Sequence, residues 1–181
     1  HGGSLTHWGC MQERCHFNLL WYFIRPGGAP SIRVQDEDTS IDLNSTYDEY
    51  MTSAVTERFT LKGHPFDLIH VHLRAGSKTS HSIAYCANSR VVEEEPLGNK
   101  IPGLYKELED DDGPFVYQCY LSSTFLDEHV RSERTGLDIS EAKLELLDEL
   151  ELAREEIRDE IVQRSESHLS NYMIALREQS R

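Results

Sequence analysis

Residues 57–74 read ERFTLKGHPFDLIHVHLR, and polar and apolar residues alternate on both sides of the turn-forming residues 62–65. Alternation with a period of two is typical of strands that bury one face. A third segment of the same kind, HSIAYCA, follows at residues 81–87. We therefore expect a meander of antiparallel strands at residues 57–61, 66–74 and 81–87, buried on one side.

The remaining segments add shorter strands and helices to this meander. Residues 115–121, FVYQCYL, have high β propensity, and residues 31–35 alternate like a short strand. Residues 5–24 carry apolar side chains at helical spacing. We also expect a brief strand and a short helix within residues 41–51, a polar connection that leaves the sheet at residues 88–98, and a short helix at residues 101–108.

The composition changes at Ser140, after which Glu, Leu, Arg and Ala dominate and neither Gly nor Pro occurs. An approximate apolar stripe runs through this part: Leu144, Leu147, Leu150, Ile157, Ile161, Leu169, Tyr172 and Leu176. This spacing predicts one long helix or two consecutive helices that reach the C-terminus. Such a helix would pack on the sheet or lead to a further segment.

Composition limits the function classes. The chain has 181 residues, of which 38% are hydrophobic and 28% charged, which is enough for one folded domain with a helical extension. The formal net charge of -14 opposes a broad phosphate-binding surface, so we expect no direct nucleic-acid partner. No apolar run approaches the roughly 18 residues of a membrane span, so we expect no membrane association.

The cysteines and the first residues indicate the setting of the chain. The four cysteines have no paired spacing, which favours a reducing, cytoplasmic location. The chain starts at His1 with neither an initiator methionine nor a targeting segment. We therefore expect that it belongs to a longer protein.

One charged stretch, FLDEHVRSERTGLDI at residues 125–139, is the main candidate site. Arg131 and Arg134 could form surface ion pairs with Asp127, Glu128 and Glu133, which contribute little. Alternatively, one arginine could bind a phosphate, because its planar guanidinium donates two parallel hydrogen bonds and keeps its charge. Gly136 would allow the tight loop that presents it. The chemistry of these residues leaves both interpretations equally open.

A second candidate is a zinc site on the predicted strand at residues 66–74. His70 and His72 lie two residues apart and share a face, where Cys86 or His81 of a neighbouring strand could join them. Structural zinc sites, however, usually show paired ligands of recognisable spacing. The pattern therefore favours two strand histidines on a solvated face over a zinc-binding enzyme.

Several segments together resemble one group of prokaryotic ATP-binding proteins of the gyrase, heat-shock-chaperone, histidine-kinase and MutL superfamily (GHKL ATPases). They are IAYCANSRVV at residues 83–92, IPGL at 101–104, FVY at 115–117, FLDE at 125–128 and SERT at 132–135. The resemblance is to the transducer, or middle, domain that follows the ATPase domain. It extends loosely from Phe17 to the C-terminus and is most specific between residues 83 and 135.

The resemblance implies an α+β fold, a mostly antiparallel sheet with helices on one face in a two-layer sandwich. Residues 1–139 would form this transducer-like domain, and residues 140–181 a long C-terminal helical segment. Transducers of the superfamily offer a basic residue to the terminal phosphate of ATP in the neighbouring domain. Arg134, in the Ser-Glu-Arg-Thr segment, is the first choice for that residue and Arg131 the second.

The sequence also departs from complete members of the superfamily. It has no helix with the Glu and Asn that activate water and hold magnesium, no Asp-x-Gly-x-Gly and no Gly-rich lid. Gly136-Leu137 stands where the family has a bulkier aromatic residue. The chain is therefore expected to hold no cofactor itself, while ATP and Mg²⁺ bind in the parent protein.

The resemblance thus implies a non-catalytic domain that senses phosphate and relays the nucleotide state to dimerisation or to a downstream effector. Its partners would be the upstream ATP-binding domain of the same protein and a second copy in a homodimer. The alternative is a protein–protein interaction module with no nucleotide role, whose long C-terminal helix pairs with a partner or with itself.

Overall fold

The computed structural model describes residues 21–25, 31, 33–35, 40–42, 51–74, 80–133, 136–142 and 151–179. Most of the helix predicted at residues 5–24 and the short helix predicted before Met51 lie outside these residues. Trp21 to Ile24, at the end of the first segment, are helical. Arg134 and residues 143–150 of the predicted C-terminal helix also lie outside the described residues.

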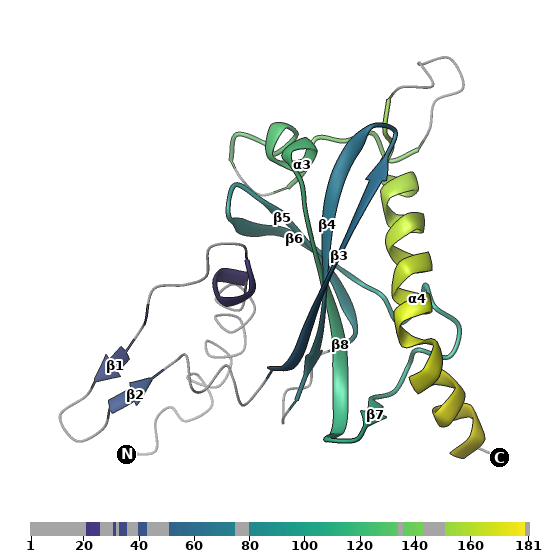
Figure 1. The fold of residues 1–181 in the computed structure, drawn as a ribbon. Coiled ribbons are helices and arrows are strands. Elements are labelled where there is room, and N and C mark those ends of the chain that lie inside the picture. Colours follow the sequence, from purple (N-terminus) through teal and green to yellow (C-terminus); the bar gives the residue numbers. More distant parts are fainter. Residues whose placement is uncertain are drawn as a thin grey trace, which may run out of the picture.

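The chain has an α+β fold, in which a six-stranded, mostly antiparallel mixed sheet carries a long C-terminal helix (Figure 1). The five strands of the main path run in the order β3-β4-β8-β5-β6, and β7 pairs with β8 beside this path. Their bounds are Met51–Leu61 for β3, His64–Leu73 for β4, Ser82–Ala87 for β5, Arg90–Pro96 for β6, Leu108–Asp110 for β7 and Gly113–Ser122 for β8. A separate two-stranded sheet pairs β1 (Arg33–Gln35) with β2 (Ser40–Asp42).

Two tight turns make the local hairpins. Lys62 and Gly63 have positive φ angles of 45° and 82° between the paired residues Leu61 and His64. Two positive φ angles are the signature of the type I′ turn, whose twist matches that of the strands it joins. Asn88 and Ser89, with φ of 49° and 66°, form the corresponding turn between β5 and β6.

The predicted meander is wrong in one respect, because β8 lies between β4 and β5. It pairs antiparallel with β4, as His70 opposite Cys119 shows, and parallel with β5, where Ile83 lies opposite Cys119. Every residue from 115 to 121 is buried, so this strand needs a covered position with neighbours on both sides. The central position in the sheet gives β8 these neighbours. This position depends on pairings between residues far apart in the chain, which local sequence patterns do not indicate.

Two other local predictions are also wrong. Residues 90–96 do not leave the sheet but form its edge strand β6, whose glutamates lie partly exposed at the edge or contact α4. Residues 101–108 form turns and the start of β7 instead of a helix. Leu97, Ile101 and Leu104 in this stretch are nearly fully buried, so the irregular segment is held by side chains that enter the core.

The sheet is buried on both faces. One face contributes alternate residues, such as Leu68, Tyr85 and Leu121, to the larger hydrophobic core. The other face contributes Ile69 and Tyr120 to a smaller core, in which Trp21 stacks on Tyr120 with a centroid distance of 5.9 Å. The period of two in each strand therefore separates two cores and not a core from solvent.

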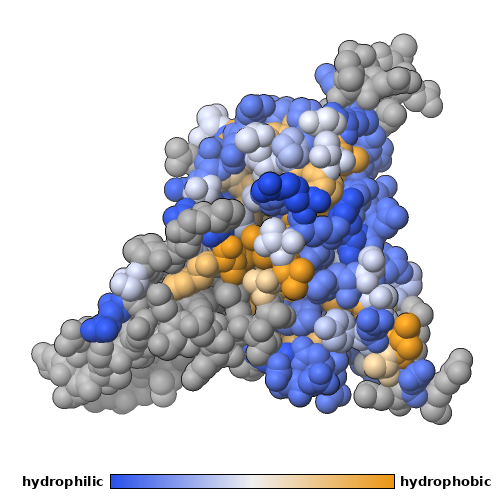
Figure 2. Space-filling model, viewed as in Figure 1, coloured by the Kyte–Doolittle hydropathy of each residue, from blue (hydrophilic) through white to orange (hydrophobic). Residues whose placement is uncertain are grey.

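Helix α4 (Arg154–Gln179) covers the face of the larger core and runs along the strands (Figure 1). Its buried positions recur every four residues: Ile157, Ile161, Ser165, Leu169 and Met173. This spacing places one stripe against the sheet. Figure 2 shows mainly hydrophilic side chains on the visible face over α4. The predicted long C-terminal helix is therefore confirmed from Arg154 onward, whereas the described residues 140–142 and 151–153 of the predicted helical segment are not helical.

A short helix, α3 (Thr124–Glu128), follows β8 and leads into the candidate arginine stretch. Ser123 caps it, because its Oγ accepts a hydrogen bond from the amide of Leu126 at 3.0 Å. Phe125 and Leu126 are buried and fix the helix against the sheet. Among the described residues, no helix combines the length and apolar content needed to cross a bilayer.

Candidate functional site

The stretch that follows α3 is closed at its base, and we call residues 131–136 the arginine loop, of which residues 134 and 135 lie outside the described residues. Val130 and Leu137 pair as an antiparallel bridge at its base. The amide of Arg131 donates to the carbonyl of Gly136 at 2.9 Å, and the amide of Asp138 donates to the carbonyl of His129 at 2.7 Å. The ends of the loop are therefore fixed by backbone hydrogen bonds.

Arg131 lies at the start of this loop and is exposed, whereas Arg134 lies outside the described residues. Within the part of the chain that the structure describes, no carboxylate lies within 4.0 Å of the Arg131 guanidinium in an ion pair. Asp127 has another role, because its Oδ1 accepts a hydrogen bond from the amide of Asn88 at 2.7 Å. The ion-pair explanation of the arginines thus finds no support at Arg131.

A surface depression of about 400 Å³ adjoins the loop, between residues 128–133 and Asp138. Its lining includes the Arg131 side chain together with Glu128, Glu133 and Asp138. Three carboxylates around a shallow depression do not form an anion site by themselves. A phosphate at this loop would need further donors from outside the described residues.

The base of the loop contacts α4 through one side chain of the edge strand. Glu93 of β6 accepts a hydrogen bond from the amide of Leu137 at 2.6 Å with Oε1. Its other carboxylate oxygen, Oε2, pairs with the guanidinium of Arg154 in the first turn of α4. The loop, the sheet edge and the helix meet at this carboxylate.

A second group of polar side chains lies between the sheet and α4 and is centred on three histidines. His70 and His72 of β4 are 2% and 3% exposed, so their predicted solvated face is wrong. Helix α4 covers them and adds His168, whose ring stacks on that of His70 with a centroid distance of 4.2 Å. We call His70, His72, His168 and their hydrogen-bond partners the histidine network.

The partners of His70 determine its tautomer. Its Nε2 lies 3.3 Å from Oε2 of Glu57 and its Nδ1 lies 2.6 Å from the hydroxyl of Tyr117. Because a carboxylate only accepts, a neutral His70 donates from Nε2 to Glu57, and Nδ1 then accepts from Tyr117. The Tyr117 hydroxyl also lies 2.9 Å from Oγ of Ser165 on α4.

The same argument applies to His72. Its Nδ1 lies 3.3 Å from Oδ2 of Asp110, and its Nε2 lies 3.2 Å from Nε2 of His168. His72 therefore donates to Asp110 and accepts from His168. Arg74 pairs with the same Asp110 carboxylate. All three histidines can satisfy these bonds while they are neutral.

Burial lowers the pKa of each histidine in the network. For His168, burial and the neighbouring rings of His70 and His72 lower the pKa to about 4. Burial also lowers the pKa of His70 and His72, although Glu57 and Asp110 act in the opposite direction. The three histidines are therefore neutral near pH 7, as their hydrogen bonds require.

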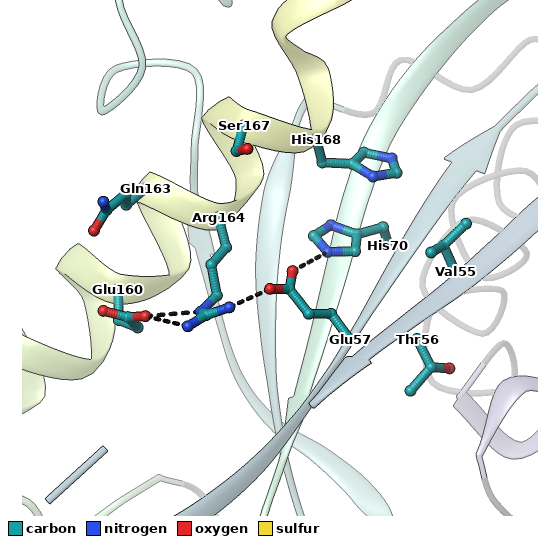
Figure 3. Close-up of a pocket in the computed structure, with 9 residues that line it drawn as sticks. All are labelled: Val55, Thr56, Glu57, His70, Glu160, Gln163, Arg164, Ser167 and His168. Atoms are coloured by element: carbon teal, nitrogen blue, oxygen red, sulfur yellow. Dashed lines mark hydrogen bonds and ion pairs between the residues drawn. The ribbon is translucent and has the colours of Figure 1, made fainter. Parts of the chain in front are cut away.

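A groove of about 530 Å³ opens beside this network, between β3 and α4 (Figure 3). Glu57 and Arg164 form an ion pair across it, and Arg164 also pairs with Glu160 at 2.6 Å. Burial raises the pKa of Glu57, but the hydrogen bonds from His70 and Arg164 outweigh it, so the pKa lies below its usual value. Arg164 is thus shared between two carboxylates, and the described lining of the groove offers no unpaired cation to an anionic ligand.

The predicted zinc ligands do not converge. Cys86 belongs to the smaller core on the opposite face of the sheet from His70 and His72. His81 uses both ring nitrogens, one with the carbonyl of Lys106 at 2.8 Å and one with the amide of Tyr117 at 2.9 Å. In the described parts of the chain, no group of three or more His, Cys, Asp or Glu side chains could hold a metal ion.

No protein-family model matches the chain, and no curated protein or solved structure matches it either. The geometry of the loop and of the network therefore stands without a relative for comparison.

The sequence does not single out Glu93, Arg154 or His168. Glu93 lies in a segment whose composition predicts a polar connection, and Arg154 and His168 lie in a predicted helix with many other charged or polar side chains. One signal was present, because His70 and His72 interrupt a strand whose other residues are strongly apolar. Buried strand histidines need polar partners, and α4 was the remaining element that could supply them.

Proposed function

We propose that this chain is a transducer domain of a GHKL-type ATPase, which supplies a phosphate-sensing arginine to ATP bound in an upstream domain. The proposal rests on the resemblance of the segments between residues 83 and 135. Arg134 is the first choice for the sensing residue and Arg131 the second. The arginine stabilises charge on the terminal phosphate and attacks nothing itself.

The observation that supports this proposal best is the closed base of the arginine loop. A side chain that contacts a phosphate in another domain has to extend from a fixed position, since misplacement weakens a directional hydrogen bond. The bridge between Val130 and Leu137 and the hydrogen bond between Arg131 and Gly136 provide such a base. The exposed guanidinium of Arg131 is consistent with a loop that faces a partner.

The test uses the chain joined to its native upstream segment. Arg134→Ala lowers the turnover of ATP if this residue contacts the terminal phosphate, and Arg131→Ala lowers it if Arg131 does. Arg58→Ala is the matched control, because Arg58 is an exposed arginine that pairs with Asp67 at 2.6 Å, away from the loop. Unchanged turnover in both loop variants would refute the arginine role.

The alternative is an interaction module whose C-terminal helix pairs with a partner or a second copy. In the described part of α4, Ile157 and Ile161 are buried against the sheet of the same chain. Charged substitutions at these two positions would therefore unfold the domain, and they would not report on assembly. A test of the alternative has to use an exposed apolar residue, such as Ile174 at 52% exposure.

A further inference from the structure

Glu93 is the one side chain whose two carboxylate oxygens join the arginine loop to α4 among the described residues. Oε1 accepts from the amide of Leu137 at 2.6 Å, immediately after the loop, and Oε2 pairs with Arg154. Both bonds involve a charged group, and such hydrogen bonds are roughly twice as strong as neutral ones. The Glu93 carboxylate thus contacts both the end of the arginine loop and the first turn of α4.

The loop side of this contact has no free space. A Cβ added at Gly136 would lie 2.6 Å from Oε1 of Glu93, which is closer than a Cβ, which makes no hydrogen bond, can approach an oxygen. Gly136 is buried, and its carbonyl accepts from Arg131. If the backbone at residues 136–137 moves toward Glu93, it must therefore displace the Glu93 carboxylate.

The helix side is equally constrained. The Arg154 guanidinium lies over the ring of Tyr85, 5.0 Å from its centroid, and is 15% exposed. One turn later, Arg158 pairs with Glu95 of the same edge strand at 3.0 Å. Arg154 also lies 3.9 Å from a carboxylate oxygen of Glu95, so three arginine–glutamate pairs hold the first two turns of α4 to β6.

The backbone adds a second connection at the same end of the sheet, where α3 and the start of α4 both lie (Figure 1). The amide of Arg154 donates to the carbonyl of Ser140 at 2.9 Å, and the amide of Glu155 donates to the carbonyl of Glu141 at 3.0 Å. These amides would otherwise lack partners at a helix start. The segment that leaves the loop thus caps α4.

From these contacts we propose that Glu93 is a positioning residue that couples the arginine loop to the first turn of α4. The inference rests on the proposed function. It names the contact through which phosphate binding at the arginine loop would change the packing of the first turn of α4. A displaced loop withdraws the Leu137 amide from Glu93, the carboxylate follows, and its pair with Arg154 weakens. The two ends of the coupling share the same carboxylate.

The first test needs no nucleotide and uses hydrogen exchange of single amides in this chain. Gly136→Ala perturbs the loop, and Glu93→Gln keeps the acceptor for Leu137 but removes the carboxylate charge from the pair with Arg154. We expect Gly136→Ala to speed exchange at the amides of Arg154 and Glu155 about tenfold, the effect of losing one such hydrogen bond. In the Glu93→Gln background, the same change should add less than about twofold, because coupled sites are not additive.

Glu94→Gln is the matched control, since Glu94 lies next in the same strand and is exposed. It should leave the effect of Gly136→Ala intact. If Gly136→Ala changes exchange only within the loop, or if its effect on α4 is the same with Gln at position 93, the coupling is refuted. Far-UV circular dichroism of each variant verifies that the fold is retained.

The second test separates the coupling from the proposed function, using the chain joined to its native upstream segment. Glu93→Gln should lower kcat for ATP and leave KM unchanged, because Glu93 positions the loop and does not touch ATP. The proposed function alone would be refuted if hydrogen exchange shows the coupling but neither Arg134→Ala nor Arg131→Ala changes the turnover of ATP. A loss of turnover on arginine removal, with uncoupled exchange and a normal kcat for Glu93→Gln, would refute the coupling alone.

Discussion

His168 shows how a single residue can make stability depend on pH. Its pKa in the folded protein is about 4, below the 6.5 of a free histidine. Above pH 6.5 both states are neutral and the residue contributes no pH dependence. Below pH 6.5 the unfolded chain binds a proton that the folded chain does not, so stability falls as the pH falls towards 4.

We expect the free energy of unfolding to decrease by up to about 2 kcal/mol between pH 6.5 and pH 4.5, since one pKa unit is worth about 1.4 kcal/mol and partial exposure of His168 reduces the effect. His168→Gln should flatten this dependence, because Gln does not titrate and can still donate to His72. Urea unfolding at several pH values measures it, and Ser167→Ala on the same helix is the control. An unchanged pH dependence in His168→Gln would show that His168 is not the titrating group.

Tyr117 tests the hydrogen bonds of the histidine network. Its buried hydroxyl contacts Nδ1 of His70 and Oγ of Ser165. Tyr117→Phe leaves both without this partner, and we expect a loss of about 1–3 kcal/mol in the free energy of unfolding. Tyr105→Phe, at a residue that is 71% exposed, should change stability by less than about 0.5 kcal/mol. Equal effects of the two substitutions would contradict the network.

At the scale of elements, α4 is held to the sheet by a stripe of side chains with four-residue spacing. Ile161 lies in this stripe and is fully buried, whereas Ile174 on the same helix is 52% exposed. Ile161→Ala should cost about 2–4 kcal/mol, because it removes buried carbons and leaves a cavity. Ile174→Ala should stay within about 0.5 kcal/mol.

Denaturant unfolding of the two isoleucine variants compares the same chemical change at two depths. If α4 paired with another chain instead of the sheet, Ile161→Ala would act on an assembly and depend on protein concentration. We predict that Ile161→Ala lowers the free energy of unfolding by the same amount at every protein concentration.

Elements with a local signal were predictable from the sequence, and their arrangement was not. The β3–β4 hairpin followed from alternation on both sides of Lys62-Gly63, and α4 from the helical spacing of Ile157 and Ile161. The place of β8 between β4 and β5 depends on pairings between residues far apart in the chain, such as Leu68 with Leu121. No periodicity encodes such a pairing.

The whole molecule is a sheet with a core on each face, and this explains the errors at the candidate sites. A histidine at alternate positions of a strand looks solvated, unless one knows that a helix covers that face. Similarly, Glu93 lies 44 residues before Leu137, so nothing near the arginine loop identified its partner. The sequence alone suggests that the arginines could bind a phosphate, but it does not predict which residues fix the ends of their loop.

The chain is acidic, and several of its described arginines, among them Arg58, Arg74 and Arg154, form ion pairs with aspartate or glutamate. Arg131 has no such pair in the described residues, although it lies close to Glu128 and Glu133 in the chain. An arginine that extends from an anchored loop without an intramolecular pair is available to a phosphate from another domain. The fixed base, together with the exposed Arg131, makes the arginine loop the part of the surface on which the proposed function depends.

The most direct measurement is the steady-state turnover of ATP by the chain joined to its native upstream segment, compared between Arg134→Ala and Arg58→Ala. We predict that Arg134→Ala lowers kcat at least about tenfold, which corresponds to the loss of one strong hydrogen bond to a phosphate. Arg58→Ala should leave kcat unchanged. If Arg134→Ala and Arg131→Ala both retain the full kcat in an active fusion, the arginine loop has no role in ATP turnover, and the central claim is wrong.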